Sequence, residues 1–246
     1  MARKNNDFDR IIDMHCHILP GLDDGASTPA ETLAMLRTAV DEGITDIVVT
    51  PHFKLNTDNA SPRRIYDVMR SAQEAVDHYN IPIRFYPGNE VFYFDDLPRY
   101  LKEKRIFTMN GSDFVLIEFS PITPYHTIQN ALDSVLFAGY HPIIAHVERY
   151  ESILKNPEHV EFLFDMGVRI QVNASSVTGD NGKTVKKFVH ELLKDGLVDF
   201  IGTDAHSNRH RKPEIIKCKE ILIKKCGVEY ARQLLRDNAV ELLGLD

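Results

Sequence analysis

Cysteine is scarce in this chain, with only three residues among 246, namely Cys16, Cys218 and Cys226. Three cysteines cannot make a disulfide framework, because at least one of them would stay unpaired. The composition therefore excludes the class of small secreted proteins that disulfides hold together.

Long apolar runs are also missing. No run approaches the roughly 18 residues that a membrane-spanning helix needs. The first residues, Met-Ala-Arg-Lys-Asn-Asn-Asp, lack the apolar core of a secretory signal peptide. We therefore expect a cytoplasmic protein that does not insert into a membrane.

An excess of positive charge, which is usual for a nucleic-acid-binding surface, is absent too. Lysine and arginine number 29 against 36 for aspartate and glutamate, which gives a formal net charge of -7. We therefore expect no nucleic-acid partner. The chain is 43% apolar and long enough to bury a full core, so we assign residues 1–246 to one domain.

What is present is a regular alternation of short apolar runs with helical segments. This alternation predicts an α/β fold in which right-handed helical crossovers join parallel strands. We favour closure into a barrel, with an open doubly wound sheet as the alternative. Strands are predicted at 11–15, 46–50, 83–87, 114–117, 142–145, 168–172 and 198–202, and helices at 28–42, 61–79, 95–105, 127–138, 158–166, 182–194 and within the tail 213–243.

Histidine and carboxylate residues recur where the predicted strands end. Two histidines spaced i and i+2, as in His15 and His17, point to the same side of a strand. In a parallel barrel the carboxyl ends of the strands share one face, and that face carries the active site. The candidates are His15, His17, Asp24, His52, Glu90, Glu118, His146, Asp204 and His206.

Taken singly, each of these residues has an ordinary structural explanation. Asp23 and Asp24, for example, could simply form a turn ahead of Gly25. Taken together, the acids would repel one another or be costly to desolvate on one rim unless cations neutralised them. Mixed histidine and carboxylate ligation without cysteine suits zinc, manganese or iron. Nine candidate ligands are more than one ion needs, so we expect two or three ions, with Glu90 bridging two.

The segments that carry these residues resemble the polymerase and histidinol phosphatase (PHP) superfamily. The resemblance is greatest to its bacterial manganese-dependent protein-tyrosine phosphatases of the capsule type. It implies a distorted (β/α)7 barrel and three divalent ions, with manganese first and iron or zinc as alternatives. The segments are 12–25, Thr50-Pro51-His52, Gly88-Asn89-Glu90, 116–119, 144–149 and 203–206.

The resemblance also implies a role for each site residue. Arg149 and Arg211 match family arginines that hold the phosphate, although Arg209 lies close to Arg211 in the same loop. The ligand sets it implies are His15, His17, Glu90 and Asp204 for one ion, Glu90, Glu118 and His146 for the second, and Asp24, His52 and His206 for the third.

The function implied is hydrolysis of phosphotyrosine on proteins by a metal-activated hydroxide, without a phosphoenzyme. Its substrate would be the tyrosine-rich tail of a bacterial kinase that governs capsule or exopolysaccharide synthesis. Clustered divalent ions and arginines suit this reaction because charge neutralisation is what phosphate monoesters need. Two alternatives stay open, namely a small-molecule phosphatase such as histidinol-phosphatase and a non-catalytic metal-binding module. The oligomeric state is open as well.

Cys226 and Arg232 also fit the Cys-five-residues-Arg spacing of cysteine-based tyrosine phosphatases. Those enzymes place the thiolate in a glycine-rich loop between a strand and a helix. Here we predict helix on both sides of Cys226, so we interpret the spacing as a coincidence.

Overall fold

The computed structural model describes residues 10–245, and all of its paired strands are parallel. They form two sheets, with strand orders β1-β2-β4 and β3-β5-β6-β7-β8-β9. The strands are β1 (Ile12–Cys16), β2 (Asp46–Val49), β3 (His52–Phe53), β4 (Arg84–Pro87), β5 (Glu90–Phe92), β6 (Phe114–Glu118), β7 (His141–Ile144), β8 (Arg169–Asn173) and β9 (Phe200–Gly202).

The two sheets make one curled structure, because β3 continues the path of β2 and β5 continues the path of β4. The segment that follows β9 lies beside the end of β1. A parallel bridge pairs Cys16 with Ala205, and the His17 amide donates to the Ala205 carbonyl at 2.9 Å. The predicted α/β class and distorted barrel are therefore confirmed. A parallel strand is found at each of the seven predicted positions.

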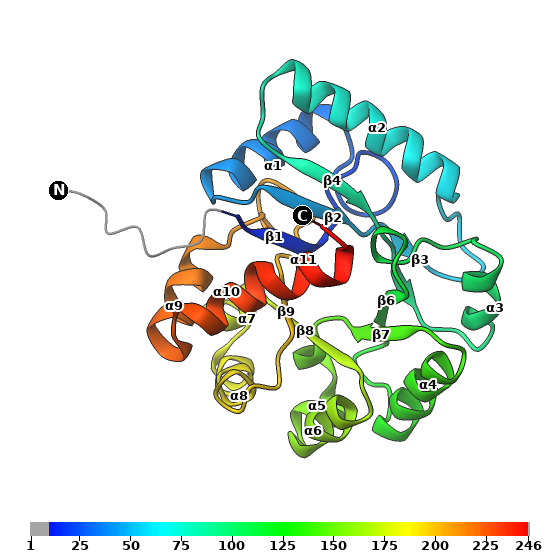
Figure 1. The fold of residues 1–246 in the computed structure, drawn as a ribbon, viewed down its shortest axis with the longest axis vertical. Helices are drawn as coiled ribbons and strands as arrows, with labels where there is room; N and C mark the ends of the chain where they lie inside the picture. The colour runs from blue at the N-terminus through cyan, green and yellow to red at the C-terminus, as the bar shows by residue number, and fades with distance from the viewer. Residues whose placement is uncertain (1–9, 246) are drawn as a thin grey trace.

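Helices surround the strands (Figure 1). No helix in the described part of the chain combines the length and the apolar character that a bilayer crossing would require. The helices are α1 (Pro29–Asp41), α2 (Pro62–His78), α3 (Leu97–Lys102), α4 (Tyr125–Phe137), α5 (Glu151–Leu154), α6 (Glu158–Asp165), α7 (Ala174–Thr178), α8 (Lys183–Lys194), α9 (Ile216–Cys226), α10 (Val228–Arg232) and α11 (Asn238–Leu243), with a π-helical turn at Gln233–Asp237.

The first two long helices begin at local signals. The Thr28 side chain accepts a hydrogen bond from the Glu31 amide at 3.2 Å, and proline takes the first turn of α1. Ser61 caps α2 in the same way at 3.3 Å. Such caps satisfy amides that have no partner within the helix, and proline has no amide hydrogen to lose there.

Helix α11 closes one end of the barrel, crossing the strands in Figure 1. Its apolar residues Leu242 and Leu243 belong to the same buried cluster as Ile12, near the start of β1, and Phe200, at the start of β9. This cluster fills the end of the barrel where the strands begin. The opposite end, where the strands finish, is left for polar side chains.

Two predicted strands, found as β2 and β4, are each followed after a short break by a further short strand that was not predicted. His52 follows β2 and Glu90 follows β4, as predicted, and each is also the first residue of the added strand, β3 and β5 respectively. Pro51 supplies no amide hydrogen, and the Asn89 side chain donates to its carbonyl at 2.9 Å, which fixes the break. Gly88 lies at the second break, where a Cβ atom would come within 3.0 Å of the Val48 side chain.

Candidate metal centre

The site begins with β1, whose extended backbone directs His15 and His17 to the same side. Both rings are buried, and their Nε2 atoms lie 3.1 Å apart. The other ring nitrogens are held from behind. His15 Nδ1 donates to Gln171 at 3.2 Å, and His17 Nδ1 donates to Asp23 at 2.6 Å. These contacts leave both Nε2 atoms facing one shared space, the arrangement seen for histidine ligands of metals.

Glu90 occupies the centre of that space. Its Oε2 atom lies 3.1 Å from the Nε2 atoms of His15 and His17 and 3.1 Å from His52 Nδ1. Its Oε1 atom lies 2.8 Å from His146 Nε2. One buried carboxylate therefore faces four imidazoles.

The outer members of the site extend from Glu90 toward solvent. Glu118, at the end of β6, lies 3.2 Å from His52 Nδ1. Asp24 lies 3.4 Å from the Nε2 atoms of both His52 and His206. Asp24 comes from the loop after β1 and His206 from the loop after β9, so the two ends of the barrel wall meet here.

Asp204 links the buried side of the site to two arginines. One of its oxygens is 2.5 Å from Arg149 Nη2, and the other is 2.5 Å from Arg211 Nη2. Asn173 also donates to Asp204 at 2.9 Å. Asp204 and His146 both have positive φ, at 53° and 32°. Such backbone strain in non-glycine residues is concentrated at functional sites.

The structure thus brings together all nine predicted ligand candidates, which we name the histidine–carboxylate cluster. The ligand atoms of eight of them fall into three groups, each compact enough to surround one ion, while His146 belongs to none of these groups and contacts Glu90 at 2.8 Å. The first group agrees with the set implied by the resemblance. The group with Asp24, His52 and His206 contains His17 in addition to the implied residues. The group with Glu90 and Glu118 contains His52 where the resemblance implied His146. The groups are His15, His17, Glu90 and Asp204; His52, Glu90 and Glu118; and His17, Asp24, His52 and His206.

Several ligand atoms of the cluster are placed to bind a cation but not to hydrogen-bond one another. Glu90 Oε2, His52 Nδ1 and His206 Nε2 are buried and have no hydrogen-bond partner among residues 10–245. Glu90 Oε2 and His52 Nδ1 are nevertheless 3.1 Å apart, so the angle rather than the distance prevents a hydrogen bond. Donor atoms that converge without bonding one another are what a shared cation requires.

The pKa values of the cluster show the same need for positive charge. Burial opposes protonation of His17 and His52, but contacts with Asp23 and with Asp24, respectively, outweigh it and raise their pKa to about 9 and about 11. Burial likewise opposes ionisation of Glu90, yet the His15 charge holds the pKa of that carboxyl well below its usual range. In the protein alone, protons on histidines balance the carboxylates, and divalent cations can take their place.

Two clefts adjoin the cluster. The polar cleft, with a volume of about 510 Å³, is lined by Arg149, Asn173, Asp204 and Arg211, among others. The aromatic cleft, of about 430 Å³, has a different character. It is lined by Asp24, His52, Glu118, Lys54, Phe92 and Phe119, together with residues from the loops at 22–23, 57–59 and 121.

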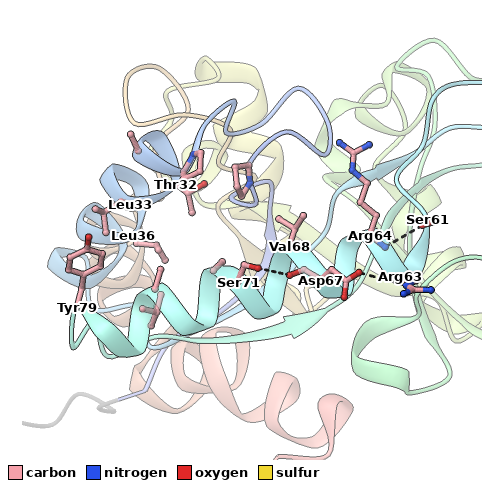
Figure 2. A pocket seen from close by; sticks show the side chains of 16 residues that line it. Thr32, Leu33, Leu36, Ser61, Arg63, Arg64, Asp67, Val68, Ser71 and Tyr79 are labelled. Carbon is pink, nitrogen blue, oxygen red and sulfur yellow. Dashed lines mark hydrogen bonds and ion pairs between the residues drawn. The ribbon is translucent and has the colours of Figure 1, made fainter.

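A further groove lies away from the cluster, between α1 and α2. Its volume is about 830 Å³, and none of the nine cluster residues lines it. Figure 2 shows Leu33 and Leu36 of α1 near Tyr79 at one end of α2, with Arg63 and Arg64 toward the opposite end. The groove is largely apolar and holds no histidine or cysteine, so we do not associate it with catalysis.

Three residues that support the cluster were not among the predicted site residues, namely Asp23, Gln171 and Asn173. Asp23 was treated as a turn former beside Asp24, whereas its carboxylate holds His17 and accepts from the His52 amide at 3.0 Å. Gln171 and Asn173 lie two residues apart on β8, where all five residues but Arg169 are buried. Polar residues at a spacing of two in a buried strand were the available signal.

Arg211, rather than Arg209, contacts Asp204. The structure also confirms helix on both sides of Cys226, which ends α9 one residue before Gly227 and α10. Arg232 pairs with Asp237 at 2.8 Å. Cys226 and Arg232 therefore form no phosphate-binding loop.

Comparisons with known proteins agree with this geometry. The family model for capsular polysaccharide synthesis proteins CpsB/CapC matches residues 11–244. The tyrosine-protein phosphatase YwqE of Bacillus subtilis is 30% identical over 237 residues, covering 95% of this chain and 91% of YwqE. CpsB of Streptococcus agalactiae serotype III, also a tyrosine-protein phosphatase, is 33% identical over 242 residues, covering 95% of this chain and 98% of its own length.

Solved structures extend the comparison to the fold. A structure from work on YwqE of Bacillus subtilis and CpsB of Streptococcus pneumoniae, described as unique metal-dependent tyrosine phosphatases, superimposes with a TM-score of 0.89. It is 30% identical and covers 95% of this chain and 94% of its own. The histidinol phosphate phosphatase of Lactococcus lactis shares the fold, with a TM-score of 0.58 at 15% identity, covering 88% of this chain and 94% of its own.

Proposed function

We propose a mechanism and a substrate for this chain, which belongs to the CpsB/CapC family of capsular polysaccharide synthesis. The chain is a metal-dependent tyrosine-protein phosphatase, as are relatives that match it over almost its whole length. The observation that carries the mechanism is the position of Glu90, whose two carboxylate oxygens lie within 3.1 Å of four imidazoles at the end of the barrel.

We assign three divalent ions to the histidine–carboxylate cluster, with manganese first and iron or zinc as alternatives. Glu90 would bridge two of them. When bound, such ions neutralise phosphate oxygens and lower the pKa of the water that attacks phosphorus. Binding and orientation of the phosphate are the work of side chains of the protein.

Arg149 and Arg211 hold the phosphate in this mechanism. The side chains of Arg149 and Arg211 are 39% and 42% exposed. The Nη2 atom of each lies 2.5 Å from a carboxylate oxygen of Asp204, which orients it. A guanidinium presents two parallel N–H groups to a pair of phosphate oxygens and stays charged at every physiological pH. The arginines therefore add fixed positive charge where the phosphate must bind.

The hydrolysis is direct, without a phosphoenzyme. Cys16, the cysteine nearest the cluster in sequence, is fully buried, and burial holds the pKa of its thiol well above its ordinary value. A buried neutral thiol is a poor nucleophile. The leaving phenolate has a solution pKa of about 10, so it departs without much help from a general acid.

The physiological substrate that we infer is the tyrosine-rich tail of a bacterial tyrosine kinase of capsule or exopolysaccharide synthesis. The family to which the chain belongs is named for capsular polysaccharide synthesis, which supports this choice. We place the reaction in the cytoplasm, where a kinase tail would be phosphorylated.

Metal analysis combined with two substrates tests the proposal. The purified protein is assayed on a phosphotyrosine peptide and on histidinol phosphate, before and after chelation and after return of Mn²⁺. We expect turnover of the peptide to be favoured, to disappear on chelation and to return with the metal. Full activity without metal, or a phosphorylated enzyme in rapid-quench samples, would contradict the mechanism.

A further inference from the structure

We propose that the aromatic cleft is the binding site for the phenol ring of the substrate, with Phe92 and Phe119 as its walls and Lys54 at its edge. This inference rests on the proposed function, because it assigns a place to the ring that the phosphate carries. It goes beyond that function by naming the residues that distinguish an aryl phosphate from an alkyl phosphate.

Strand geometry explains why an aromatic layer lies directly above the cluster. His52 of β3 is paired in register with Glu90 of β5. Side chains two residues farther along a strand lie on the same face. Lys54 and Phe92 therefore follow His52 and Glu90 toward solvent, and Lys54 Nζ lies 4.9 Å from the centre of the Phe92 ring.

The next strand also borders the cleft. Phe92 of β5 is paired in register with Glu118, the last residue of β6. Phe119 follows at once and also lines the cleft. The ring of Phe119 turns to the buried side, where it stacks on Tyr93, so Phe92 is the aromatic face open to a ligand. A ring placed against Phe92 would have its phosphate-bearing end toward Glu118 and His52, which line the same cleft.

The walls of the cleft are held in place before any ligand arrives. The Phe119 ring stacks on Tyr93 at 5.5 Å and meets Tyr150 edge-on at 5.9 Å, and its amide donates to the Tyr150 hydroxyl at 3.2 Å. The loop with Lys54 is closed by Asn59, whose side chain accepts from the Lys54 amide and donates to its carbonyl, both at 2.7 Å. Preformed walls reduce the entropy lost on binding.

Charge determines which end of the substrate enters. Asp58, an exposed acid that belongs to none of the candidate metal groups, lines the aromatic cleft and would repel a phosphate there. The polar cleft offers Arg149 and Arg211 instead, and no phenylalanine or tyrosine is among its described lining residues. The phosphate therefore faces the arginines, and the ring turns toward Phe92, where aromatic contacts and the Lys54 cation favour it.

Binding of two phosphonates measures the contribution of the ring without turnover. Phenylphosphonate and methylphosphonate are titrated calorimetrically into metal-loaded protein, and the ratio of their dissociation constants is compared between variants. We expect the wild type to prefer the phenyl compound by about tenfold, and Phe92→Ala to lower this preference to about threefold or less. Phe162→Ala, which changes an exposed phenylalanine of α6, should keep the wild-type ratio.

Phe92→Leu supplies a second variant that keeps most of the apolar volume, and metal content is measured for each protein. A ratio between those of the wild type and Phe92→Ala supports the proposal. A wild-type ratio in both Phe92 variants overturns it, even if phosphotyrosine is hydrolysed. If the wild type instead neither hydrolyses phosphotyrosine nor prefers the phenyl compound, the proposed function fails together with the ring site.

Discussion

At the scale of single residues, Asp23 supports two parts of the cluster at once. Its carboxylate accepts from His17 Nδ1 at 2.6 Å and from the amides of Gly25 and His52 at 2.9 and 3.0 Å. The His17 contact fixes which ring nitrogen faces Glu90. Asp23 is therefore a positioning residue, although the sequence pattern gave the functional role to its neighbour Asp24.

Replacing Asp23 should weaken metal binding without removing any ligand. We expect Asp23→Ala to lower metal affinity by about 10- to 100-fold, because outer partners of ligating histidines contribute about that much. Competition with a chromogenic chelator measures the affinity. Asp58→Ala, which removes an exposed acid from the neighbouring loop, is the matched control. An unchanged affinity in Asp23→Ala would show that His17 needs no such support.

The two arginines on Asp204 should affect catalysis rather than metal binding. We expect Arg149→Ala and Arg211→Ala each to lower kcat/KM about a hundredfold, as loss of a donor to transition-state charge commonly does. Metal content should stay at the wild-type value. Steady-state kinetics on a phosphotyrosine peptide, with metal analysis of each variant, tests this.

Arg209→Ala is the control for the arginine prediction, because Arg209 lies in the same loop as Arg211. Its kcat/KM should stay close to that of the wild type. A large loss in Arg209→Ala, with little change in Arg211→Ala, would exchange the roles of the two residues.

At the scale of elements, the loop after β1 depends on a close approach of two backbones. A methyl group on Gly25 would overlap the carbonyl oxygen of His17, and the Ala26 amide already donates to that oxygen at 3.1 Å. The loop cannot widen at this point without moving Asp23 and Asp24. Glycine is therefore required here for lack of space.

Gly25→Ala should disturb the loop and the cluster together. We expect a loss of about 1–3 kcal/mol in the free energy of unfolding, which is typical of overpacking, and a lower metal content. Thermal denaturation and metal analysis measure the two effects. Ser27→Ala, two residues along the same loop, is the control and should resemble the wild type. A Gly25→Ala protein with wild-type stability and full metal would show that the loop can shift freely.

The elements that could be predicted from the sequence are those set by local chemistry. The starts of α1 and α2 follow from a capping side chain and a proline within a few residues. The short helix α7, by contrast, begins where Glu148, distant in the chain, accepts from the Asn173 amide at 2.9 Å. The breaks within the strand paths depend in the same way on neighbouring strands, so their positions could not be read from the sequence.

At the scale of the whole molecule, the cluster brings many ionisable groups into the end of the barrel. The candidate ligands come from almost every strand path, and β8 contributes Gln171 and Asn173 as supports. The recurrence of histidine and carboxylate at strand ends was enough to predict this convergence. The supports could not be predicted so readily, because amide side chains in strands have many structural roles.

Removing the metal should lower the stability of the whole domain. Ligand that binds only the folded state at about 100 times its Kd adds about 2.7 kcal/mol. For a chain of this size, this corresponds to roughly 5–10 °C in Tm. We expect chelation to lower the Tm of the wild type by that amount and Mn²⁺ to restore it, as measured by circular dichroism. Glu90→Ala should show little response, and an equal response would place the stabilising metal elsewhere.

The bridge between Cys16 and Ala205 joins two segments 189 residues apart into one wall, with His15 on one side and Asp204 on the other. The whole segment between β1 and β9 must therefore be synthesised before the first and last contributors can meet. A fragment that ends before Asp204 would lack two candidate ligands, Asp204 and His206, so we expect it to hold metal incompletely. Assembly of the cluster therefore requires both β1 and the loop after β9.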